Sequence, residues 1–101
     1  MVIEFGGYPF EGPYPVAYKL EDKSGVFLIL DRRDYVFYVI DVGEASKVKT
    51  RIEKNYRERQ WSKQIKGQIF VAALYTPNEQ KPGRIKIKKE IRKQYNPPCR
   101  K

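Results

Sequence analysis

Most of the side chains in this sequence that could bind a ligand or take part in a reaction are cationic. The chain of 101 residues has 21 Lys and Arg against 12 Asp and Glu, and its formal net charge is +9. The charge is uneven, because residues 1–44 hold four cations and eight carboxylates, whereas residues 45–101 hold 17 cations and four carboxylates. Each Lys or Arg placed on a phosphate releases a counterion, so a basic half of this density indicates a polyanion partner such as nucleic acid. A basic surface without a fixed ligand is the alternative interpretation.

The composition excludes several kinds of catalytic site. There is no histidine, so imidazole is absent as a base, an acid or a metal ligand. The single cysteine, Cys99, cannot complete a zinc site of the usual composition or form an intrachain disulfide, and a reducing, cytoplasmic location is expected. The sequence also lacks a Gly-rich phosphate loop and the GxSxG motif of hydrolases. No apolar run approaches a membrane span and the N-terminus does not read as a signal peptide, so no membrane partner is expected.

Residues 25–51 are the stretch around which the other elements are arranged. Residues 25–30 and 35–42 are apolar and aromatic runs of strand length, which predict a β-hairpin. Residues 31–34, with the sequence DRRD, are too polar to be buried and are typical of a hairpin tip. Gly43 is expected to end the second strand, where the chain must bend sharply.

The hairpin sets two expectations about burial and register. Both faces of residues 26–30 are apolar, so helices are expected on each side of the sheet. A two-residue turn at residues 32–33 would place Phe27 and Asp41 on opposite faces, whereas a three-residue turn or one bulge would place them on the same face.

The remaining elements follow from periodicity and from the positions of Gly and Pro. A first helix is predicted over residues 45 to about 58, with Ser46 as its N-cap and one apolar stripe that includes Tyr56. Trp61 is expected to be an apolar anchor of a short second helix. Residues 1–24 predict an N-terminal arm or edge strand packed on a single domain, with residues 16–20 as its strand candidate. The other predicted elements are the second helix (57–66), a third strand (68–76), a loop (76–83) and a last helix (84–95) packed through Ile87, Ile91 and Tyr95.

Several of these features together resemble a known family. Gly25, Val26 and Phe27 form a Gly-apolar-aromatic triplet on the first strand, Val42 and Gly43 close the second strand, Arg51 lies eight residues past Gly43, and the last helix runs into Asn-Pro-Pro. The layout resembles the GIY-YIG nuclease domain family, as a small, stand-alone and divergent member. The resemblance covers roughly residues 24–101 and implies a GIY-YIG-like domain over residues 25–101. It also implies an α+β fold with a three-stranded antiparallel sheet flanked by helices.

The resemblance also implies a chemistry and shows where this chain departs from it. Active members cut DNA with one divalent metal ion held by a carboxylate on the last helix. Tyrosines of the two strand motifs line the site, and an Arg of the first helix steadies the phosphate. In this sequence the tyrosine positions hold Phe27 and Asp41, and the carboxylate position holds Lys88. A lysine at that position repels a cation, so cleavage is expected to be weakened or lost.

Three functions stay open on these residues. In the first, a nuclease-fold domain engages nucleic acid, DNA above all, and needs no cofactor. In the second, a rebuilt endonuclease uses Mg²⁺ or Mn²⁺, and the third is a protein-interaction scaffold. Asp41 either serves the rebuilt site or pairs with Arg51 or Lys88 to hold the fold, and Arg51 contacts either a phosphate or Asp41 or Glu44. The candidate residues are Lys47, Arg51, Lys88, Lys89, Arg92 and Lys93 for nucleic acid, Asp41, Arg51, Tyr38 and Tyr56 for catalysis, and Glu90 for metal.

Overall fold

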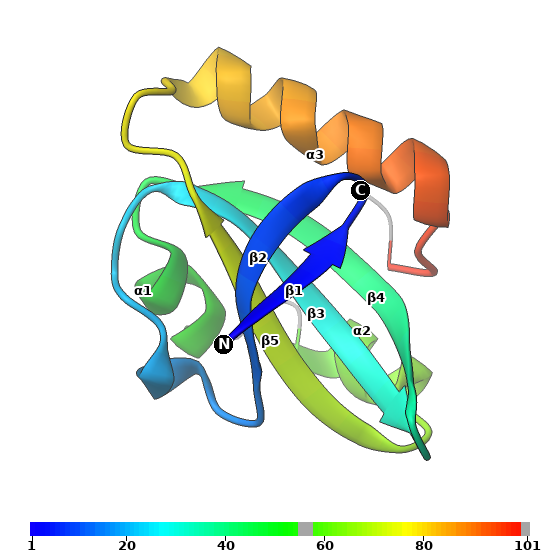
Figure 1. Ribbon diagram of the computed structural model, residues 1–101. Helices are drawn as coiled ribbons and strands as arrows, with labels where there is room; N and C mark the ends of the chain where they lie inside the picture. Colours follow the sequence, from blue (N-terminus) through cyan, green and yellow to red (C-terminus); the bar gives the residue numbers. More distant parts are fainter. Residues whose placement is uncertain (55–57, 100–101) are drawn as a thin grey trace.

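The computed structural model describes residues 1–54 and 58–99, which form an α+β fold (Figure 1). Its antiparallel sheet has five strands in the order β1-β2-β5-β3-β4. No helix within the described residues is both long and apolar enough to cross a membrane. The strands are β1 (Val2–Phe5), β2 (Tyr8–Tyr14), β3 (Gly25–Arg33), β4 (Val36–Ala45) and β5 (Gln68–Tyr75). The helices are the 3₁₀ helix η1 (Ala17–Lys19) and the α-helices α1 (Val48–Glu53), α2 (Glu58–Gln64) and α3 (Lys81–Tyr95).

The predicted three-stranded sheet is wrong, because the N-terminal residues add two further strands to it. Residues 1–14 fold into the hairpin β1-β2, and β2 pairs antiparallel with the outer edge of β5. The hairpin turns at Gly6 and Gly7, whose φ angles of 59° and 84° suit glycine. Residues 16–20, expected as an edge strand or arm, instead contain η1. Proline cannot donate a hydrogen bond to a neighbouring strand, so within sheets it occurs at edges and at irregular positions. β2 contains proline, and its pairing with β5 shifts register between Glu11 and Tyr14.

Strand β3 is buried on both faces, which confirms that helices cover each side of the sheet (Figure 1). Phe27 and Ile29 pack in one core with α1 and α2. Val26, Leu28 and Leu30 pack in the other core, together with Ile87 and Ile91 of α3. α1 and α2 therefore lie on one face of the sheet and α3 lies on the other.

The β3–β4 hairpin is longer than predicted at both ends. Asp31, expected at an exposed tip, is fully buried, and the turn lies at Asp34 and Tyr35 instead. A bulge between Ile29 and Leu30 places Asp41 opposite Ile29, on the same face as Phe27.

Gly43 was predicted to end the second strand of the hairpin, but it lies inside β4. The strand continues to Ala45, and Gly43 is paired with Phe27 of β3. A Cβ at Gly43 would lie closer than 3.0 Å to three ring atoms of Phe27. The glycine is therefore needed for the close approach of a buried ring, and not for a bend.

The helix boundaries also differ from the predictions. α1 begins at Val48, and its N-cap residue Lys47 makes no side-chain cap, so Ser46 is not the cap. Asp22 takes that role from the loop between η1 and β3, because its carboxylate accepts hydrogen bonds from Thr50 N and Thr50 Oγ1 at 2.9 and 2.6 Å. α3 begins at Lys81, inside the predicted loop, since a proline in the first turn of a helix loses no hydrogen bond. The expected position of Tyr56 on the first helix lies outside the described residues.

The contact of Gly43 with Phe27 predicts a cost for any side chain there. We expect Gly43→Ala to lower the free energy of unfolding by about 1–3 kcal/mol, because Phe27 is buried and its ring cannot move aside. Chemical denaturation measures the change. Gly83→Ala is the matched control, since its added Cβ meets the end of the flexible Glu79 side chain. Equal stability of the two variants would contradict the proposed role of Gly43.

Candidate nucleic-acid interface

The two helices that were expected to share one site lie on opposite faces of the sheet. Arg51 belongs to α1, which packs with the core of Phe27, whereas Lys88 belongs to α3, which packs with the core of Leu28. None of the three grooves considered below is lined by both residues. Arg51 and Lys88, both candidates for contact with nucleic acid, therefore belong to opposite sides of the sheet.

Asp41 is buried and held by neighbours that fix its carboxylate. It is 2% exposed, its Oδ2 accepts a hydrogen bond from Trp61 Nε1 at 2.8 Å, and its Oδ1 accepts one from Val42 N at 2.8 Å. Arg92 Nη2 lies 3.8 Å from Oδ1. Trp61 itself is buried in the core of Phe27, as expected of an anchor. Both carboxylate oxygens therefore already accept hydrogen bonds inside the protein.

Part of the basic content of α3 serves the outer edge of β4. Arg84 Nε donates to Glu44 Oε1 at 3.0 Å in a largely buried ion pair. Arg92 Nη2 donates to the carbonyl oxygen of Val42 at 2.9 Å. Arg84, Lys88 and Arg92 are spaced four residues apart, so they share one side of the helix. Arg84 and Arg92 therefore act as structural contacts of the strand, whereas Lys89 and Lys93 of the predicted set are exposed.

Glu90 and Tyr38, two other candidates for metal binding and catalysis, have contacts of their own that do not include Asp41. Glu90 accepts a hydrogen bond from the Tyr8 hydroxyl at 2.7 Å, and this bond to a carboxylate raises the pKa of Tyr8. Tyr38 lies beneath the guanidinium of Arg33, with 4.2 Å between the guanidinium carbon and the ring centre. Tyr56 lies outside the described residues. Within the described part of the chain, no three His, Cys, Asp or Glu side chains are grouped as a metal would require.

Asp31 is a second buried carboxylate, which the sequence analysis missed. Its Oδ2 accepts hydrogen bonds from Arg33 Nε at 2.7 Å and Lys66 N at 2.9 Å, and its Oδ1 accepts one from Gly67 N at 2.8 Å. Burial by itself would raise the pKa of Asp31, but these hydrogen bonds outweigh it and lower the pKa below 3.8. Asp31 thus fastens the segment between α2 and β5 to the end of β3. In the sequence, the alternation of residues 27, 29 and 31 along one strand was the signal that the Asp31 side chain faces the protein interior.

Exposed cations lie on both helical layers, with Lys81, Lys86, Lys89 and Lys93 on α3 and a larger group on the layer formed by α1 and α2. Among the side chains described in residues 47–54 and 59–66, six exposed cations accompany one exposed carboxylate, Glu53. We call these six side chains the basic α1–α2 surface. They are Lys47, Arg51, Lys54, Arg59, Lys63 and Lys66.

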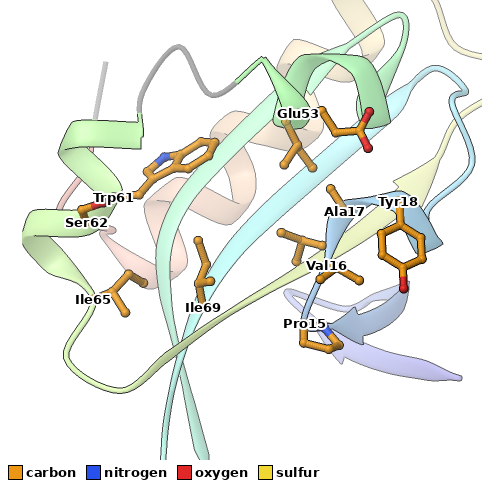
Figure 2. A pocket seen from close by; sticks show the side chains of 11 residues that line it. Pro15, Val16, Ala17, Tyr18, Glu53, Trp61, Ser62, Ile65 and Ile69 are labelled. Carbon is orange, nitrogen blue, oxygen red and sulfur yellow. The ribbon is translucent and has the colours of Figure 1, made fainter.

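Three grooves on the described part of the chain could accommodate a ligand. An apolar groove of about 580 Å³ separates α2 from the η1 segment, and Figure 2 shows Trp61 and Ile65 on one side, Val16 on the other and Ile69 between them. A second groove, of about 540 Å³, lies where the turn at Gly6 and Gly7 meets α3. A third groove, of about 340 Å³, runs along β4 and includes Tyr38, Arg33 and Lys66.

Comparison with known proteins yields no relative for this chain. No protein-family model, curated protein or solved structure matches it. What this surface can do therefore follows from its own geometry and charge.

The contacts of Asp41 predict a stabilising role. We expect Asp41→Ala to lower the free energy of unfolding by at least about 1–3 kcal/mol, because the N–H groups of Trp61 and Val42 lose their acceptor in the core. Urea unfolding followed by the fluorescence of Trp61, the single tryptophan, measures the loss. Asp41→Asn keeps one acceptor oxygen and is expected to lose less. An Asp41→Ala protein that is fully stable but no longer binds Mn²⁺ would instead favour the rebuilt metal site.

The lowered pKa of Asp31 predicts a dependence of stability on pH. A carboxylate whose pKa is lower in the folded state stabilises it above the unfolded pKa, and this contribution is lost as the pH falls through the folded value. The difference in unfolding free energy between wild type and Asp31→Asn is expected to be constant above about pH 5 and to shrink below pH 3.8. Denaturant titrations at several pH values measure it, with Asp34→Asn as the control for one lost charge. A difference that does not change with pH would be inconsistent with this role.

Proposed function

We propose that this chain binds nucleic acid through the basic α1–α2 surface and does not cleave it. The observation that carries the proposal is the excess of six exposed cations over one exposed carboxylate among the side chains that the structure describes on that layer. Long, exposed Lys and Arg side chains from two neighbouring helices can each approach a phosphate and release a counterion. The overall charge of +9 adds long-range attraction for the same partner.

The positions of the carboxylates favour binding of nucleic acid without cleavage. Asp41 is buried and accepts hydrogen bonds at both oxygens, and Glu90 belongs to α3, whereas Arg51 belongs to α1 on the opposite face. A one-metal mechanism needs a carboxylate, a metal and the scissile phosphate at one place. Those residues of the rebuilt endonuclease that the structure describes are not grouped in that way, which supports recognition over hydrolysis.

Kinship with the GIY-YIG nucleases is part of the proposal. It rests on Gly25, Phe27, Val42 and Gly43, which lie in the paired strands β3 and β4, and on Arg51 in α1. The pairing of Phe27 with Gly43 gives two of these residues a packing role that is independent of any reaction. A scaffold that kept its motif residues for packing is compatible with a lost cleavage centre.

Reversal of charge on α2 tests the binding surface. We expect the double variant Arg59→Glu, Lys63→Glu to weaken binding of a fluorescent oligonucleotide by about tenfold or more, since about two phosphate contacts are lost. Its plot of log affinity against log salt should also become shallower by about 2. Fluorescence anisotropy titrations over a range of salt concentrations provide both values.

The matched control is Lys86→Glu, Lys89→Glu, which makes the same change in net charge on α3. It should keep the salt slope of the wild type, and an equal loss in both variants would show that net charge alone is recognised. The same wild-type protein, incubated with plasmid and Mg²⁺ or Mn²⁺, is expected to produce no nicked circles. Nicking that disappears in Arg51→Ala would contradict the non-cleaving part of the proposal.

A further inference from the structure

The groove along β4 combines aromatic rings, cations and amides at one edge of the sheet. Its volume of about 340 Å³ falls within the range of about 300–1,000 Å³ typical of ligand pockets. The polar side chains and tyrosines that line it are Arg33, Tyr38, Gln64, Lys66, Tyr95 and Asn96. They come from β3, β4, α2, the loop after α2, α3 and its C-cap, so the groove spans both faces of the sheet.

The outer edge of β4 is covered along one part of its length and open along the rest, where the groove lies. β4 is the last strand of the sheet, and its carbonyl groups at Ile40 and Val42 accept hydrogen bonds from Cys99 N and Arg92 Nη2. From Val36 to Val39, no described strand pairs with this edge. The hairpin end of β4 is thus the part of the edge that the groove presents to a partner.

Two tyrosine rings of the groove are exposed although their surroundings hold them in place. The side chains of Tyr38 and Tyr95 are 43% and 40% exposed. Tyr38 carries the guanidinium of Arg33 on its ring, and the Tyr95 ring packs edge-on against Phe5 while its hydroxyl accepts a hydrogen bond from Gly6 N at 3.1 Å. Exposed rings held in this way are suited to stacking with a flat ligand.

The cations of the groove are positioned by a buried acid. Asp31 binds the Nε of Arg33 and the backbone N–H of Lys66, so both residues are fixed at the groove. The guanidinium retains further N–H donors, because Arg has five and the ion pair uses its Nε. The groove therefore offers positive charge beside the exposed rings.

We propose that this groove binds single-stranded nucleic acid, with bases stacked on Tyr38 and Tyr95 and phosphates on Arg33 and Lys66. The inference rests on the proposed function and specifies the class of nucleic acid. Base faces in a duplex are covered by neighbouring base pairs, so rings at an open groove select unpaired bases. An extended peptide added to the edge of β4 is the competing occupant, but strand addition requires neither paired cations nor exposed rings.

Binding of labelled oligothymidylate and oligouridylate of about 12 nucleotides, with a duplex of the same length, tests the inference. Tyr38→Ala and Tyr95→Ala are each expected to weaken binding of the single strands by about tenfold, and to leave duplex binding unchanged. Tyr38→Phe and Tyr95→Phe keep the rings and should bind as the wild type does. Tyr18→Ala is the matched control, because Tyr18 is 65% exposed outside this groove. Circular dichroism and thermal melting confirm that each variant is folded.

The outcomes separate this inference from the function on which it rests. Single-strand affinities that are unchanged in both alanine variants would overturn the groove but leave binding by the basic α1–α2 surface intact. A wild-type protein that binds neither single strands nor duplex would overturn both. A polyglutamate peptide that binds with the same dependence on Tyr38 and Tyr95 would assign the groove to extended peptides and overturn the inference. Binding of either oligonucleotide with the predicted tyrosine dependence supports it.

Discussion

The burial of β3 on both faces is the constraint on which the rest of the structure depends. Residues 25–31 are all buried, and each fully buried large apolar side chain contributes about 1.5–3 kcal/mol only while its neighbours stay in place. β3 therefore needs a strand on each edge and helices on each face. β4 and β5 supply the edges, and α1, α2 and α3 supply the faces. The hairpin β1-β2 then covers the edge of β5 that this arrangement would leave open.

Two buried carboxylates fix the position of α2 on this framework. The helix has few apolar residues, so Trp61 and Ile65 provide limited hydrophobic attachment. Asp41 holds the indole of Trp61, and Asp31 holds the backbone at Lys66 and Gly67 just beyond the helix. Buried charges are tolerated when hydrogen bonds satisfy them, as they do here. The same contacts hold α2 where its last residue, Gln64, and the following Lys66 line the groove along β4.

What the sequence could predict depended on how local each signal was. The two-faced burial of residues 26–30, the strand near residues 68–76 and the packed edge of α3 at Ile87 and Ile91 follow from periodicity, and the structure has them. Asp31 was misjudged because its partners at Lys66 and Gly67 lie 35 and 36 residues away. The pairing of β2 with β5 is likewise distant in sequence, and the prolines of residues 1–15 concealed the strands. For the site, the sequence showed the positive charge of residues 45–101. Composition alone cannot distinguish a cation that is bonded to the sheet from one that faces solvent.

The basic side of α3 illustrates this last distinction. Arg84 pairs with Glu44 and Arg92 bonds to Val42, and the spacing of four residues places Lys88 between them on the same side of the helix. A carboxylate at position 88 would therefore lie between two guanidinium groups, which bind carboxylates tightly and would compete with any divalent cation. The cationic side of α3 thus protects the outer edge of β4 by binding the Glu44 carboxylate and the Val42 carbonyl oxygen. The partners of these guanidinium groups lie within the protein, so Arg84 and Arg92 add to the net charge of residues 45–101 but little to its exposed cationic surface.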